Sequence, residues 1–145
     1  MRVAVLNGPN LNLLGTREPE LYGRTTLAEL ERLVRDHAVA LGLDLVEWCQ
    51  TNHEGELVEA IQALPGRADA ALINAAAYTH TSLAVRDACL AARVPFVEVH
   101  LTNVFAREAE RRHSLLADLA IGVIAGFGPT SYLLALRAIA GRDAG

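Results

Sequence analysis

Short apolar runs alternate along this chain with longer segments that have a helical period. The apolar runs have the length of buried strands and lie at residues 2–7, 43–49, 69–74, 95–101 and 119–125. The helical segments lie at residues 26–41, 54–64, 82–93, 104–113 and 129–140. Strands that alternate with helices form parallel sheets with right-handed crossovers. We therefore expect one three-layer α/β domain over residues 1–145, with a five-stranded parallel sheet and helices on both faces.

The basic residues narrow the possible chemistry. All 13 are arginines, and the net charge of the 145-residue chain is −4. A chain without lysine cannot form a Schiff base, anchor pyridoxal phosphate or build a P-loop. The acidic balance also argues against a nucleic-acid partner, which favours a basic face.

The two cysteines indicate a compartment. Cys49 and Cys89 lie far apart in apolar stretches and have no metal-ligand spacing, so we expect buried free thiols. Free thiols are typical of the reducing cytoplasm, where we expect this protein to work. The apolar run at the N-terminus is too short for a signal peptide, and none approaches the roughly 20 residues of a membrane span. We expect no membrane partner.

Three common site types are not supported by the motifs. The pair Gly126 and Gly128 forms only GxG, and it follows the last predicted strand rather than the first, which argues against a dinucleotide site. No GxSxG nucleophile elbow is present. His53-Glu54 lacks a second histidine at the spacing of a zinc motif, so we predict no metal site.

Unusual polar residues gather after the predicted strands. In an open parallel sheet the ligand site lies beyond the carboxyl ends of the strands. The segments that follow those ends are residues 7–24, 49–55, 74–82, 100–107 and 126–132. The first is long for a strand-to-helix connection, as loops that cover a site often are.

Glu98 and His100 form the strongest pair. Residues two apart on a strand face the same way, so Glu98 can fix the orientation and tautomer of the His100 ring. The alternative is a structural buried pair, although a buried glutamate without a task is costly. Thr102 follows at the predicted start of a helix, where free amides favour an anion.

Arginines accompany this pair. Arg107 and Arg111 are i, i+4 neighbours on the predicted helix at 104–113 and suggest an acidic ligand, the alternative being a solvated surface. Tyr22 is a candidate base, although a tyrosine is normally protonated at neutral pH. A close Arg17 favours the phenolate. The alternative for Arg17 and Tyr22 is an ordinary loop contact.

The chain resembles the type II 3-dehydroquinate dehydratases of the shikimate and quinate pathways along nearly its whole length. The likeness rests on several long motifs in the same order, namely residues 6–23, 50–61, 73–88, 97–103, 107–108 and 126–136. It implies a flavodoxin-like fold and anti elimination of water from 3-dehydroquinate through an enolate, without metal or organic cofactor. It also implies a homo-oligomer, a trimer that usually stacks into a dodecamer.

The resemblance implies a role for each catalytic residue. Tyr22 would remove the proton beside the ketone, with Arg17 favouring its phenolate. Asn10 would hold the water that stabilises the enolate oxygen. His100 would protonate the departing hydroxyl, and Glu98 would orient His100.

The resemblance implies substrate contacts as well. Asn74 and the backbone amides of Leu101 and Thr102 would hold the carboxylate. His80 and Arg111 would contact the ring hydroxyls. Arg107 would line the site near Tyr22, and Asp87 would reach the site of a neighbouring subunit. Glu110 departs from the family pattern and is expected to weaken carboxylate binding slightly. The alternative function is a non-catalytic α/β module that binds an acidic metabolite.

Overall fold

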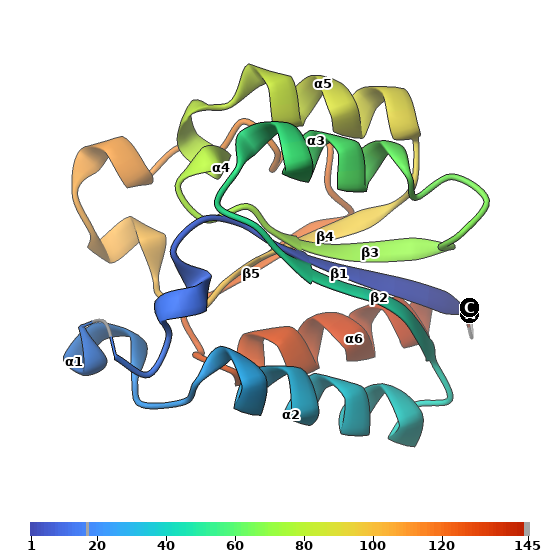
Figure 1. Cartoon of the computed structure of the whole chain (residues 1–145), viewed down its shortest axis with the longest axis horizontal. Helices are drawn as coiled ribbons and strands as arrows, with labels where there is room; N and C mark the ends of the chain where they lie inside the picture. The colour runs from blue at the N-terminus through green and yellow to red at the C-terminus, as the bar shows by residue number, and fades with distance from the viewer. Residues whose placement is uncertain (17, 144–145) are drawn as a thin grey trace.

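A five-stranded parallel sheet forms the centre of the computed structural model, which describes residues 1–16 and 18–143 (Figure 1). Its strands are β1 (Arg2–Asn7), β2 (Asp44–Gln50), β3 (Ala70–Asn74), β4 (Phe96–His100) and β5 (Gly122–Ala125). They lie in the order β2-β1-β3-β4-β5, and all four neighbouring pairs are parallel. This is the strand order of flavodoxin-like folds, so the predicted fold class is confirmed.

Two helices cover each face of the sheet. Figure 1 shows α2 (Leu27–Ala40) and α6 (Thr130–Asp143) side by side below it, and α3 (Glu54–Gln62) and α5 (Leu83–Ala92) above it. Each face has its own apolar core: Val5 and Leu136 belong to the α2/α6 side, and Leu6 and Leu57 to the α3/α5 side. The predicted three layers are present.

The helix boundaries follow from local hydrogen bonding. Thr26 caps α2, since its side-chain oxygen accepts the Glu29 amide proton at 3.1 Å. Gly42 follows the same helix with φ +73°, a left-handed conformation that glycine adopts without strain. Ser82 caps α5 in the same way through the Val85 amide.

The prediction of one helix over 104–113 is wrong. The segment contains two separate 3₁₀ turns, η2 (Val104–Ala106) and η3 (Ala109–Arg111), joined by extended backbone at Arg107 and Glu108. Asn103 favours this arrangement because its side chain accepts the Phe105 amide proton and closes a tight turn. Arg107 and Arg111 are therefore not neighbours on one helical face.

Other differences are smaller. The last strand begins at Gly122 rather than at residue 119, because the Leu119 and Ala120 amides bond back to the Leu116 carbonyl in a turn. Three short elements that the sequence did not predict flank the carboxyl edge of the sheet: η1 (Leu11–Leu13), α1 (Pro19–Tyr22) and α4 (Tyr78–Thr81).

The loops after β1 and β3 are in close contact. The Gly8 amide donates to the Asn74 carbonyl at 2.8 Å, and a Cβ on Gly8 would collide with the Ala75 carbonyl. Only glycine permits this approach. Two loops are thereby joined at the point where the strand order reverses, which is where such folds bind ligands.

Within residues 1–16 and 18–143, no helix is both long and apolar enough to span a bilayer.

Candidate active site

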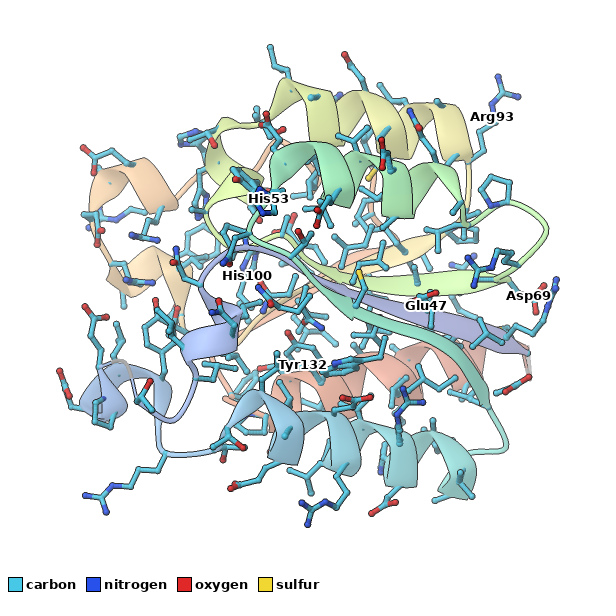
Figure 2. All side chains as sticks on the ribbon, viewed as in Figure 1. Glu47, His53, Asp69, Arg93, His100 and Tyr132 are labelled. Carbon is cyan, nitrogen blue, oxygen red and sulfur yellow. The ribbon has the colours of Figure 1, made fainter. Side chains whose placement is uncertain are left out.

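A pocket lies at the carboxyl ends of β1, β3 and β4, the predicted edge of the sheet. Figure 2 shows His100 at this end, opposite Asp69. Nine of the twelve predicted site residues line it: Asn10, Tyr22, Asn74, His80, His100, Leu101, Thr102, Arg107 and Arg111. Residues from segments far apart in the sequence therefore share one cavity.

The other three predicted residues lie elsewhere. Glu98 lies on β4, two residues before His100, and is 2% exposed. Asp87 is exposed on α5 and does not line the pocket of its own chain. Arg17 lies outside the described residues.

His100 and Glu98 are hydrogen-bonded in the sheet. His100 Nε2 lies 2.8 Å from Glu98 Oε2, and both side chains are buried. A carboxylate only accepts, so Nε2 carries the proton and Nδ1 is the nitrogen left for a ligand. This geometry suits a proton carrier whose tautomer is fixed by the residue two positions earlier.

Arg107 lies against Tyr22. Its Nη1 donates to the phenolic oxygen at 2.8 Å, and its guanidinium carbon lies 5.5 Å from the ring centroid. An adjacent guanidinium stabilises a phenolate, both by charge and by hydrogen bonding. The resemblance implied that Arg107 lies near Tyr22, and the structure brings the two into direct contact.

His80 forms one wall of the pocket beside His100. The two rings stack with centroids 6.2 Å apart and an interplanar angle of 16°. His80 Nδ1 donates to the His113 carbonyl at 2.7 Å, and His113 Nε2 donates to the His80 carbonyl at 3.0 Å. Burial lowers the pKa of His80, and the charges of His100 and Arg111 lower it further, whereas the His113 carbonyl raises it. A neutral His80 with its proton on Nδ1 offers Nε2 as an acceptor for a hydroxyl.

Arg111 is held by Glu108 at the rim. Arg111 Nε lies 2.6 Å from Glu108 Oε1, which raises the pKa of Arg111 and lowers that of Glu108. The acidic neighbour is thus Glu108. Glu110, which we expected to be the acid near these arginines, is not the partner in either ion pair described for them, since Arg107 and Arg111 both pair with Glu108.

A buried polar chain that the sequence did not predict fixes Asn74. Asn74 Nδ2 donates to the Tyr132 hydroxyl at 2.8 Å, and its Oδ1 accepts the Ala76 amide proton at 3.1 Å. The Tyr132 hydroxyl donates in turn to Asn7 Oδ1 at 2.6 Å. Figure 2 shows Tyr132 between the sheet and the lower helices. The one sequence signal for this hydrogen-bonded chain is a tyrosine within an apolar helical segment, since the hydroxyl of a buried tyrosine needs a partner.

Ser114 is a second residue that the sequence did not identify. Its hydroxyl donates to Glu98 Oε1, the carboxylate oxygen not used by His100. Nothing in the spacing of the two residues marks this contact, because it joins β4 to the loop before β5.

No three His, Cys, Asp or Glu side chains converge as metal ligands in the part of the chain that the structure describes. The acid–base groups of the pocket are instead a tyrosine with an arginine and a histidine with a glutamate. Such a site can remove one proton and deliver another.

Comparisons with known proteins agree with this chemistry. A model of the family described as dehydroquinase class II matches residues 1–140. The 3-dehydroquinate dehydratase of Azorhizobium caulinodans is 59% identical over 138 residues, which cover 95% of this chain and 92% of the relative. That of Dinoroseobacter shibae is 53% identical over 139 residues, covering 96% and 92%.

A solved structure shows the same fold. The type II dehydroquinase from Propionibacterium acnes superimposes with a TM-score of 0.92 at 39% sequence identity. The match covers 97% of this chain and 96% of the other. The arrangement of the sheet and its four main helices is therefore shared with that protein.

Proposed function

This chain belongs to the class II dehydroquinase family, and on that premise we propose how its pocket performs the reaction. The protein is a 3-dehydroquinate dehydratase, a lyase of the shikimate pathway that converts 3-dehydroquinate to 3-dehydroshikimate. The observation that carries the mechanism is the presence of two acid–base pairs at one pocket, Tyr22 with Arg107 and His100 with Glu98.

The first step is proton removal. Tyr22, as a phenolate stabilised by Arg107, takes the proton beside the ketone of the substrate, and the electron pair moves to the ketone oxygen. We assign Arg17 the same stabilising role. Asn10 holds the water that donates to the resulting enolate oxygen, and its place in the pocket lining supports this assignment.

The second step is loss of the hydroxyl. The enolate re-forms the ketone and expels the hydroxyl group, which takes a proton from His100 Nδ1 and leaves as water. Glu98 orients the ring through Nε2 and stabilises its charged form. Tyr22 returns its proton to solvent and His100 recovers one, so the enzyme ends each cycle unchanged.

Substrate contacts follow from the pocket lining. We assign the substrate carboxylate to Asn74 and to the backbone amides of Leu101 and Thr102, all at the carboxyl edge of the sheet. His80 and Arg111 then contact the ring hydroxyls. Because Tyr132 and the Ala76 amide hold the Asn74 amide in one orientation, Asn74 Nδ2 keeps its second proton for the substrate.

We further propose that the chain acts as one catalytic domain within a trimer, which stacks into a dodecamer in the cytoplasm. Exposed apolar side chains near the β5 edge, Phe105, Val123 and Phe127, support burial against another copy. Asp87 is exposed on α5 and does not line the pocket of its own chain, which supports a contact with a neighbouring site. The free thiols of Cys49 and Cys89 suit a reducing compartment.

An absorbance assay tests the function. Purified protein is added to 3-dehydroquinate, and the ultraviolet absorbance of the conjugated enone acid is followed with a chelator present and after borohydride treatment. A rise that survives both treatments is the expected result. No rise from folded, oligomeric protein would instead favour the non-catalytic module that binds an acidic metabolite.

A further inference from the structure

Ser114 makes three hydrogen bonds through one oxygen. Its Oγ donates to Glu98 Oε1 and accepts the amide protons of Leu116 and Ala117, each at 3.0 Å. A hydroxyl has one proton and two lone pairs, and the two amides occupy the lone pairs. The single proton therefore points at the Glu98 carboxylate and has no other orientation available.

Glu98 is in this way held from both sides. One carboxylate oxygen receives the Ser114 proton and the other receives the His100 Nε2 proton. The carboxylate is 2% exposed, so solvent contributes little to its orientation. Two fixed donors on opposite oxygens set the plane of the carboxylate, and this plane sets the direction in which His100 presents Nδ1.

The backbone that carries Ser114 is itself fastened to the pocket wall. The Leu115 amide donates to the Thr79 carbonyl at 2.9 Å, and His80 and His113 exchange hydrogen bonds beside it. Arg86 Nη1 donates to the Leu115 carbonyl at 2.7 Å. Ser114 is thus fixed relative to the same segment that carries His80.

We propose that Ser114 is a positioning residue for the elimination step, acting through Glu98 on His100. The inference rests on the proposed function, in which His100 delivers the proton to the departing hydroxyl. Ser114 does not touch the substrate. Its loss lets the carboxylate rotate, and His100 then spends less time aligned with the hydroxyl group.

This role separates the two steps of the reaction. Proton removal depends on Tyr22 and Arg107, whereas the hydrogen bonds of Ser114 described above go to Glu98 and to two backbone amides. Loss of the hydroxyl depends on His100. A Ser114 variant should therefore form the enolate normally, return it to substrate more often, and release product more slowly.

The kinetic test compares Ser114→Ala with Ser114→Thr, which keeps the hydroxyl. The substrate is deuterated beside the ketone. Product formation then measures turnover, and loss of deuterium from the recovered substrate measures proton removal. We expect Ser114→Ala to lower kcat about 10-fold, because a positioning residue accounts for only part of the contribution of a general acid. The KM should stay within about 2-fold of the wild-type value. The ratio of label loss to turnover should rise, and Ser114→Thr should restore most of the wild-type rate.

Ser131→Ala is the matched control. Ser131 is buried at the start of α6, and its Oγ accepts the Phe127 amide proton at 3.0 Å. The variant loses a serine that caps backbone, as Ser114→Ala does, and should keep wild-type kcat. If Ser114→Ala does not fold, Ser114→Cys, with its weaker donor, takes its place in the comparison with Ser114→Thr.

Three kinetic results would overturn the proposal: wild-type kcat in Ser114→Ala, an equal loss of turnover and label exchange, or Ser114→Thr as slow as Ser114→Ala. A readout that needs no substrate is the ring Nε2 proton of His100 in nitrogen-15 NMR spectra. This resonance should be sharp in wild type and in Ser131→Ala, and weaker in Ser114→Ala. A Ser114→Ala resonance equal to that of wild type would contradict the proposal. Wild-type protein without turnover would refute the proposed function separately.

Discussion

Arg107 and Tyr22 meet across 85 positions of sequence, through a 2.8 Å hydrogen bond from Nη1 to the phenolic oxygen. The tyrosine ends α1, in the connection after β1, and the arginine follows η2, after β4. The proposed base and the guanidinium that contacts it therefore come from different loops. In the proposed mechanism, proton removal depends on how these loops pack at the carboxyl edge of the sheet.

This contact makes Arg107 the first target. Arg107→Met removes the charge and the hydrogen bond but keeps much of the side-chain volume. Because the phenolate loses a neighbouring cation, kcat should fall about 100-fold, within the range typical of base catalysis. Steady-state rates at neutral pH check this expectation. Arg137→Met, a matched change at an exposed position on α6, should leave kcat unaltered.

Tyr132→Phe tests the buried polar chain. Without the hydroxyl, Asn74 loses an acceptor and Asn7 loses a donor, and both residues are buried. An unsatisfied buried group costs about 1–3 kcal/mol, so the free energy of unfolding should drop by that amount. Urea unfolding measures it. Tyr78→Phe is the control, because that half-buried hydroxyl donates to the Asn52 carbonyl at an exposed position; an equal loss there would count against the argument.

Ala76→Gly should stabilise the protein. Ala76 has φ +52°, a left-handed conformation that costs a residue with a Cβ about 1 kcal/mol and glycine almost nothing. The matched change Ala138→Gly, at an exposed position inside α6, should destabilise by about 0.5–1 kcal/mol, because glycine is less favourable than alanine within a helix. Thermal unfolding of the two variants should therefore shift in opposite directions, and shifts of the same sign would contradict this account.

His80 should make stability depend on pH. Burial lowers its pKa in the folded state, while the unfolded chain keeps a value of about 6.5. Above that value His80 is neutral in both states. As the pH falls below it, the unfolded chain binds the proton first, so stability declines until the pH reaches the folded pKa.

The measurement is urea unfolding at about pH 7.5 and about pH 5.5. Wild type should lose more stability between the two than His80→Gln, which has no ring to protonate. His53→Gln, at an exposed position, should behave as wild type does. Parallel losses in wild type and His80→Gln would remove His80 from the explanation.

The sheet and the place of the site could be predicted because they depend on local pattern. Each branched apolar run specified a strand, and the carboxyl ends of parallel strands must meet at one edge. The pairing of Glu98 with His100 followed from the two-residue period of a strand. These inferences needed no knowledge of which distant segments touch.

The features that could not be predicted from the sequence depend on contacts between distant segments or on an unusual turn. The turn closed by Asn103 interrupts a segment whose residues otherwise suit a helix, so Arg107 and Arg111 reach the pocket from separate turns. Ser114 lies 16 positions from Glu98, and Tyr132 lies 58 from Asn74. Tertiary packing alone creates these contacts, and no spacing rule encodes them.

In the proposed mechanism, Tyr22 removes the first proton and His100 delivers the second. The most direct measurement follows label loss and enone formation from substrate deuterated beside the ketone, in Tyr22→Phe and His100→Ala. Tyr22→Phe should lose both activities. His100→Ala should keep the label exchange while product formation falls about 1,000-fold. Loss of exchange together with turnover in His100→Ala, or near-normal turnover in Tyr22→Phe, would contradict the two-step assignment.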